Sequence, residues 1–267
     1  VFPIKEVADI GRPKGIPLII DNTASPVICK PLAHGAAIVM HSLTKYIGGH
    51  GTSIGGIVVD GGNFDWTKNR KRQPLLNEPD QSYGGAVWID AVPQLTGANI
   101  PFVIRLRVVL LRDTGAPLAP FNAWQIIQGL ETVGLRMKQH CSNAEKVVTF
   151  LETQKKVQNV IYPTNHQGEI KERAKKYMQG GYGSLVGMDV GTKENGAKFI
   201  DNLKMLYHVA NIGDARSLAI HPATTTHSQL NDKELLAAGV TPGYVRLSIG
   251  IEHPDDIIAD IKQALAA

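Results

Sequence analysis

The apolar residues of this chain gather into short runs in its first third and into helical stripes further along. The short runs lie at residues 16–20, 36–41 and 55–60 and alternate with polar segments. The first run stops at Asp21, which is typical of a buried parallel strand, and we interpret the other two in the same way. Residues 5–10 have the pattern of a helix. The first third therefore predicts the strand and helix alternation of an α/β domain.

The middle of the chain changes character twice. Residues 65–101 are rich in Pro, Gly, Asn and Asp, which predicts long loops with short helices. Residues 123–156 have apolar residues at three- and four-residue steps, so we expect one long helix whose apolar stripe packs into a core. We place a domain boundary before this helix, between residues 1–120 and residues 121–267. The stripe comprises Leu130, Val133, Met137, Cys141, Ala144, Val148 and Leu151.

Beyond the long helix, strand-like and helix-like patterns alternate again, which indicates a second, smaller α/β unit. We predict strands at residues 159–162, 184–190 and 244–249, and helices at residues 170–178, 193–205 and 255–265.

Composition narrows the class of protein. At 267 residues, with 43% hydrophobic and 19% charged residues, the chain is typical of a globular protein. The formal charge of +4 is mild, and the basic clusters at residues 68–72 and 171–176 read as solvated surfaces, so we predict no nucleic-acid partner. The cysteines, Cys29 and Cys141, have no metal-ligand spacing, which favours a reducing, cytoplasmic compartment. No run is apolar enough to span a bilayer, and no signal peptide is visible.

The first residues also carry information. The sequence starts with Val1 and has no initiator methionine, and a helical pattern begins within its first five residues. We therefore expect it to begin inside a longer protein.

One lysine has neighbours that suit chemistry. Lys45 lies in the segment HSLTKYIGGHG, residues 41–51, just after the second apolar run. A lysine is most often an ordinary surface residue, but here Ser42 and Thr44 place two hydroxyl groups beside it. A phosphate dianion binds such neutral donors together with backbone N–H groups. An amine and hydroxyl groups are what a protein needs to hold pyridoxal 5'-phosphate by its aldehyde and its phosphate.

A carboxylate follows the preceding strand. Asp21 could be a turn former for the Asn22-Thr23 that follow it. However, catalytic groups of open α/β sheets lie just beyond the carboxyl ends of strands, so Asp21 and Lys45 can converge. We favour the interpretation that Asp21 keeps the nitrogen of a pyridine ring protonated. The nearby glycines lack the GxGxxG arrangement of a dinucleotide site.

An arginine interrupts the last predicted strand. Burying Arg246 unpaired would be costly, so it needs a carboxylate partner. That partner is either a side chain of the protein, in a structural ion pair, or the carboxylate of an amino-acid substrate held by a bidentate clamp. The polar stretch before the strand, residues 211–228, is either a surface loop or part of the same site. Its His221 and His227 have no third ligand at a suitable spacing, so we predict no metal site.

Together these motifs resemble the cystathionine γ-synthase-like family of pyridoxal-phosphate enzymes of methionine and cysteine metabolism. The resemblance covers essentially the whole chain and implies a fold-type I architecture. Residues 1–120 would be the carboxy-terminal part of a large cofactor domain, and residues 121–267 the long linking helix and a small α/β domain. The motifs are Asp21-Asn22-Thr23, Ser42-x-Thr44-Lys45, GGHGTSIGG at 48–56, DGGNFDW at 60–66 and HPATTTHSQL at 221–230.

The resemblance also implies roles for single residues around the cofactor. Lys45 bonds covalently to pyridoxal 5'-phosphate and is the catalytic residue. Asp21 pairs with the pyridine nitrogen, and Thr23 lies by the ring. Ser42 and Thr44 contact the phosphate. Ala24 stands where relatives often carry a larger residue, which would alter packing near the ring.

The implied reaction is a transferase reaction of methionine biosynthesis. The motifs at 48–56, 60–66 and 221–230 are closest to members that act on O-acetylhomoserine, in which sulfide or a thiol replaces acetate to give homocysteine or methionine. Ser217 and Arg246 would face this substrate, with Arg246 holding its α-carboxylate. Assemblies in the family are usually homotetramers built of active dimers.

Three alternatives stay open. The reaction could be γ-elimination, as in methionine γ-lyase, the substrate could be O-succinylhomoserine, or the chain could be a non-catalytic subunit. The family's phosphate loop, its ring-stacking tyrosine, and the tyrosine and arginine lent by a neighbouring subunit belong to an amino-terminal part. None of them is in these 267 residues. We therefore expect the chain alone to be a poor catalyst that needs this amino-terminal segment.

Overall fold

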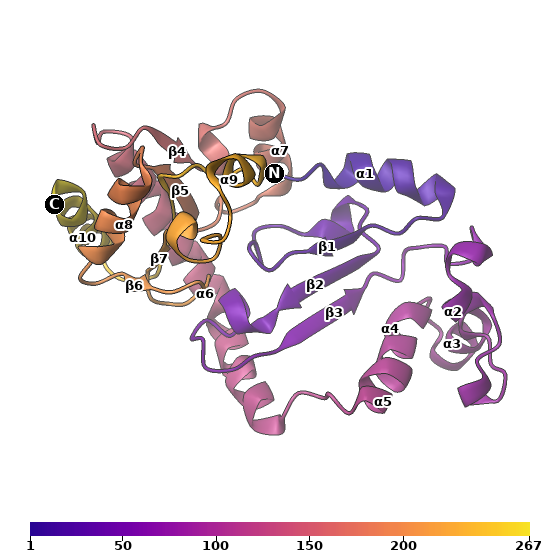
Figure 1. Cartoon of the computed structure of the whole chain (residues 1–267). Coiled ribbons are helices and arrows are strands. Elements are labelled where there is room, and N and C mark those ends of the chain that lie inside the picture. The colour runs from indigo at the N-terminus through magenta and orange to yellow at the C-terminus, as the bar shows by residue number, and fades with distance from the viewer.

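Two β-sheets form the framework, and one long helix packs against both regions of the chain that contain them (Figure 1). The computed structural model describes all 267 residues, Val1–Ala267. The small sheet has the strand order β1-β2-β3, and the large sheet has the order β4-β5-β8-β7-β6. The strands are β1 (Ile19–Asp21), β2 (Ile38–Ser42), β3 (Gly56–Asp60), β4 (Asn159–Ile161), β5 (Leu185–Asp189), β6 (Tyr207–His208), β7 (Leu218–Ile220) and β8 (Tyr244–Ser248).

The small sheet confirms the three strands predicted from the first third of the chain, but not all of their directions. β1 and β2 are parallel, with Asp21 opposite Met40. β3 is antiparallel to β2, so the expectation of a third parallel strand is wrong. The segment between β2 and β3 contains only a π-helical turn, Leu43–Ile47, and lacks the crossover helix that usually joins parallel strands.

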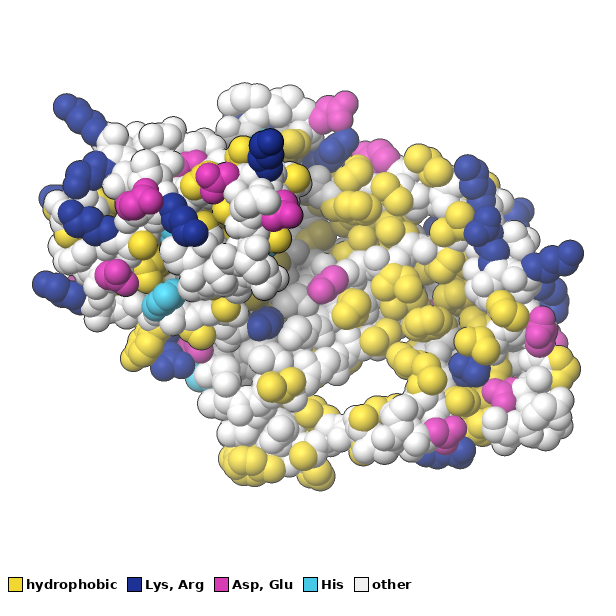
Figure 2. All heavy atoms as spheres, viewed as in Figure 1, with side chains coloured by type: hydrophobic (Ala, Val, Ile, Leu, Met, Phe, Trp, Pro, Cys, Tyr) yellow, Lys and Arg dark blue, Asp and Glu magenta, His cyan; other side chains and the backbone are white.

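The strands of the small sheet are also less buried than their apolar runs predict. Ile19 is 47% exposed, and Met40, Ile57 and Val59 are exposed as well. Figure 2 shows apolar side chains gathered on the visible face over this part of the molecule.

The helices outside the sheets confirm most of the sequence pattern. Residues 65–101 hold loops and short helices, as predicted. A π-helical segment, Leu106–Leu111, follows them. No single helix has the length and apolarity needed to cross a membrane. Only the bent pair formed by α3 and the segment Pro101–Thr114 is long and apolar enough when its two parts are taken together. The helices are α1 (Ile4–Gly11), α2 (Pro74–Asn77), α3 (Trp88–Thr96), α4 (Pro101–Arg105), α5 (Arg112–Thr114), α6 (Pro120–Leu151), α7 (Glu169–Tyr177), α8 (Lys193–Asp201), α9 (Asp232–Ala237) and α10 (Pro254–Ala266).

The long helix α6 belongs to two hydrophobic cores. Proline fits the start of a helix because the first N–H groups have no intrahelical partner, and α6 begins at Pro120. Its first half packs with Tyr46 and Ile47 beside the small sheet, and its second half joins the core under the large sheet. Leu130 is the one member of the predicted stripe that is exposed, at 51%. The start of α6 coincides with the predicted domain boundary, although the division into domains stays a prediction.

The large sheet has β8 at its centre, between β5 and β7. Alternate side chains of a strand point to opposite faces. Val245 and Leu247 are fully buried in the hydrophobic core, which places Arg246 on the other face. The strands predicted in this region are confirmed, while β6, β7 and α9 were not predicted.

Candidate active site

The residues predicted to bind a cofactor ring and phosphate lie where β1 and β2 end. The N–H of Ser42 donates to Thr23 Oγ1 at 2.7 Å, which joins the ends of the two strands. The N–H of Thr23 donates to Asp21 Oδ1 at 2.9 Å. Because the strands are parallel, Asp21 and Ser42 lie at the same edge of the sheet. The Asp21 side chain is exposed there and keeps its second oxygen free of protein partners.

A histidine lies beside this carboxylate. His41 is half-buried, and its Nδ1 has no hydrogen-bond partner. Burial lowers the pKa of His41, and the charge of Asp21 opposes that shift. An unpartnered ring nitrogen next to Asp21 is the kind of polar atom that a bound group can satisfy.

The turn after β2 carries Lys45. Its backbone departs from helical geometry, with φ −88° and ψ −130°. The Lys45 Nζ donates to Oδ1 of Asn211. The neighbouring Tyr46 is fully buried and shares a 2.7 Å hydrogen bond with Ser184, and burial raises the pKa of Tyr46 to about 12. The phenol therefore anchors the turn as a neutral group.

The two hydroxyls predicted for phosphate binding differ in their availability. Thr44 Oγ1 accepts the N–H of Gly55 at 3.1 Å and donates weakly to its carbonyl at 3.4 Å. Ser42 makes no side-chain hydrogen bond within the chain, so its hydroxyl is free to donate to an anion.

Arg246 reaches the same region from the large sheet. Its Nη2 donates to the backbone carbonyl of Asn211 at 3.3 Å. No carboxylate of the chain lies within 4.0 Å of Arg246, in contrast to four other arginines that form ion pairs. The structural ion pair considered from the sequence is therefore absent. Arg246 also lines a cavity of about 260 Å³ together with Tyr244 and His166.

Asn211 is the residue that sequence reasoning missed. Its side chain contacts Lys45 and its carbonyl contacts Arg246, so it joins the two predicted groups. The surrounding polar stretch had suggested either a loop or a site, but no local pattern distinguished this one amide from its neighbours.

Ser217 is engaged elsewhere in the structure. It is fully buried, and its hydroxyl donates to Glu252 at 2.9 Å and accepts the N–H of Gly250 at 2.8 Å. These bonds fasten the polar stretch to the segment after β8. The substrate-facing role of Ser217 stays a prediction.

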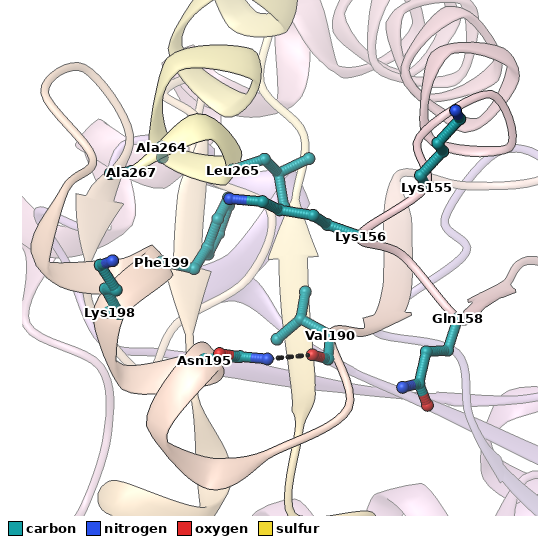
Figure 3. Close-up of a pocket in the computed structure, with 10 residues that line it drawn as sticks. All are labelled: Lys155, Lys156, Gln158, Val190, Asn195, Lys198, Phe199, Ala264, Leu265 and Ala267. Carbon is teal, nitrogen blue, oxygen red and sulfur yellow. Dashed lines mark hydrogen bonds between the residues drawn. The ribbon is translucent and has the colours of Figure 1, made fainter.

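Neither a metal site nor the cavity beside α8 and α10 competes with this site. No group of three or more His, Cys, Asp or Glu side chains is arranged to hold a metal ion. A cavity of about 290 Å³ lies among α8, α10 and the segment that follows α6, and none of the predicted site residues lines it (Figure 3). The ammonium groups of Lys155, Lys156 and Lys198 do not converge on one point in that cavity.

An amine on a turn, a carboxylate at the end of the adjoining strand, and an unpaired arginine near the amine define the class of site that pyridoxal-phosphate enzymes use for amino acids. Comparison with known proteins agrees. The family described as "Cys/Met metabolism PLP-dependent enzyme" matches residues 1–266, and the chain belongs to this family.

Individual relatives are similar over nearly the whole chain. The O-acetyl-L-homoserine sulfhydrylase of Leptospira meyeri is 49% identical over 98% of the chain and 60% of its own length. The homocysteine synthase of Schizosaccharomyces pombe is 44% identical, with coverages of 98% and 60%. A Campylobacter jejuni crystal structure assigned as an O-acetylhomoserine (thiol)-lyase, with a pyridoxyl-lysine phosphate in its chain, superimposes with a TM-score of 0.89 at 39% identity. The superposition covers 100% of this chain and 63% of the Campylobacter jejuni chain.

Two findings follow from these comparisons. The structural likeness shows the α/β, fold-type I architecture that the motifs predicted. The chain spans about 60% of the length of the curated relatives that it matches.

Proposed function

We propose that the protein containing this chain is a pyridoxal-phosphate-dependent transferase that replaces the acetate of O-acetylhomoserine with sulfide or a thiol, giving homocysteine or methionine. One observation carries the proposal. Lys45 and Arg246 both donate hydrogen bonds to Asn211, so this one residue lies between a reactive amine and a carboxylate-binding group. The names of the relatives favour this substrate over the succinyl ester.

The groups at the site fit the cofactor. Lys45 offers the amine, Asp21 a free carboxylate oxygen for the pyridine nitrogen, and Ser42 a free hydroxyl for the phosphate. Thr44 would add a second hydroxyl, and Thr23 would lie by the ring. When bound, pyridoxal 5'-phosphate supplies a ring that accepts electrons from the carbon atoms of an amino-acid substrate.

The side chains of this protein then move protons and hold the substrate. Arg246 binds the α-carboxylate in a bidentate manner, which turns Cα toward Lys45. The Lys45 amine removes the proton from Cα, and loss of a second proton from Cβ allows acetate to leave Cγ. Sulfide then bonds to Cγ, and Lys45 returns the protons to the carbon atoms. The balance is one O-acetylhomoserine and one H₂S converted to one homocysteine, one acetate and one proton.

The surroundings of the site also belong to the proposal. Ser42 and Thr44 alone offer a phosphate dianion few donors, which supports completion of the phosphate site by an amino-terminal segment of the same protein. Exposed apolar residues of α6, among them Phe121 and Trp124, support a homotetramer of active dimers. Two free, buried cysteines support a cytoplasmic location.

The test has two measurements on the intact protein. Borohydride reduction and peptide mass mapping should find a pyridoxyl group on Lys45 and on no other lysine. With O-acetylhomoserine, homocysteine should form only when sulfide is present, and Lys45→Ala should abolish its formation. An adduct at a different lysine would refute the assignment of Lys45. 2-Oxobutyrate formed at the same rate with or without sulfide would instead identify a γ-elimination enzyme.

A further inference from the structure

Three buried polar side chains on α6 contact both halves of the proposed active site. Arg136, His140 and Asn143 are spaced by four and three residues, so they share one face of the helix. Their exposed fractions are 6%, 0% and 0%. We call them the polar row. Each donates hydrogen bonds to backbone carbonyls, and none is in an ion pair.

The first member of the row binds the turn that carries Lys45. Arg136 donates to the carbonyl of Tyr46 at 2.6 Å and to that of Ile47 at 2.9 Å. These are the two residues that follow Lys45. A Cβ atom on Gly49 would come within 2.2 Å of the guanidinium, so the turn packs directly onto it. Hydrogen bonds from a buried charged donor are among the stronger ones, and here they fix the turn at two successive peptides.

The other two members bind the segment that follows β8. His140 Nδ1 lies 2.6 Å from the carbonyl of Ile249. Since a carbonyl can only accept, Nδ1 carries the proton. Asn143 Nδ2 donates to the carbonyls of Gly250 and Glu252 at 3.0 and 2.8 Å. Three peptides just beyond the strand that carries the arginine are therefore held by the same helix face.

We propose that the polar row sets the position of Lys45 relative to Arg246, with Arg136 as a positioning residue for the lysine and Asn143 as one for the arginine. The inference rests on the function proposed above. Lys45 follows β2 of the small sheet, whereas Arg246 belongs to β8 of the large sheet, and the two sheets share no strand. A catalytic amine and a substrate clamp must keep their separation to within about 0.5 Å. A continuous helix bonded to both segments supplies that constraint.

The proposal predicts a different effect at each end of the row. In the intact protein, Arg136→Lys keeps the charge but loses the fork that reaches two carbonyls. It should speed amide hydrogen exchange in residues 43–49 and lower kcat about tenfold, with little change in KM. Asn143→Asp removes both donors. It should speed exchange in residues 248–252 and raise KM about tenfold, with a smaller effect on kcat. Lys138→Met, a change at an exposed position of the same helix, should alter neither the exchange of these segments nor kcat or KM.

Loss of this separation between the two ends would contradict the proposal. If each variant speeds exchange equally in both segments, or changes kcat and KM by the same factor, the row is only a general support and the proposal is wrong. Should Arg136→Lys not fold, Thr132→Val removes the hydroxyl that accepts from Arg136 Nε at 3.1 Å, and the same effect on residues 43–49 is expected.

The exchange measurement also separates this inference from the proposed function, because it does not require catalysis. A wild-type protein without a pyridoxyl group on Lys45 after reduction refutes the function, whatever the variants do. Segments that do not respond to their own variant refute the role of the row, even in an active enzyme.

Discussion

Lys45 and Asn211 are 166 residues apart in the sequence, and their side chains are joined by a hydrogen bond. The same asparagine accepts a bond from Arg246 through its backbone carbonyl. One contact is therefore made by a side chain and the other by the main chain, so mutation can remove the first and keep the second.

Asn211→Ala should lower kcat. The change removes the acceptor that orients the Lys45 amine and leaves the carbonyl that contacts Arg246. A hydrogen bond to a charged group is worth about 1.5–3 kcal/mol, which corresponds to a fall of about 10- to 100-fold. Steady-state kinetics of the intact enzyme would measure it. A rise in KM at unchanged kcat would contradict this role and would place the amide on the substrate instead.

Arg246→Lys should weaken substrate binding. Lysine keeps the charge but cannot hold a carboxylate with two parallel bonds, so we expect KM to rise about 10- to 100-fold. The matched control is Arg216→Lys, because Arg216 is an exposed arginine whose partner is the protein's own Asp214. If both variants had the same KM as the wild type, Arg246 would not be the carboxylate clamp.

Two glycines of α6 should respond in opposite directions to alanine. A Cβ atom at Gly129 would lie 2.3 Å from the carbonyl oxygen of Gly48, whereas one at Gly134 would meet nothing within 4 Å. Gly129→Ala should therefore lower the free energy of unfolding by about 1–3 kcal/mol through overpacking. Gly134→Ala should raise it by about 0.5–1 kcal/mol, because alanine favours a helix interior. Chemical denaturation of both variants measures the two changes in the free energy of unfolding. Changes of the same sign would contradict the packing of α6 on the Lys45 turn.

Protonation of His140 should destabilise the fold in acid. Burial lowers the pKa of His140 from 6.5 to about 4. Between these values the unfolded chain binds a proton that the folded chain does not, so stability falls as pH falls through this window. The loss from this residue is up to about 3 kcal/mol at the lower end.

The variant His140→Asn isolates that contribution. Its amide nitrogen can replace Nδ1 as the donor to Ile249 but does not titrate. Denaturation measured from pH 7 to pH 4 should show a shallower dependence in this variant than in the wild type. A wild-type slope in His140→Asn would show that other groups cause the acid sensitivity.

Local patterns predicted the strands and the long helix because each depends on residues close together in the chain. They also placed Asp21 and Lys45 correctly at strand ends. The direction of β3 was not predictable in this way, because it depends on the connection and not on the apolar run itself. β6 and β7 contain only two and three residues, too few to show a period.

The parts of the site that sequence reasoning missed are long-range. The sequence shows that Arg246 interrupts an apolar strand, but not which face of the sheet it occupies. It therefore left open whether the carboxylate partner of Arg246 comes from the protein or from a substrate. Asn211 is defined as a site residue only by contacts across the fold. The hydrogen bond from the Ser217 hydroxyl to Glu252 is likewise a long-range contact that no local pattern predicts. Such choices between similar polar residues require coordinates.

The alternation of side chains along β8 has a consequence for refolding. A slip of one residue would exchange the two faces, so that Arg246 would enter the hydrophobic core and Val245 would take its place near Lys45. Such a molecule would contain an unpaired buried charge and would also lack the group that we propose to bind the carboxylate of the substrate. Correct strand register and a complete binding site therefore arise in the same event. In a refolding experiment, the recovered number of substrate-binding sites per chain should report the fraction of molecules whose central strand is correctly registered.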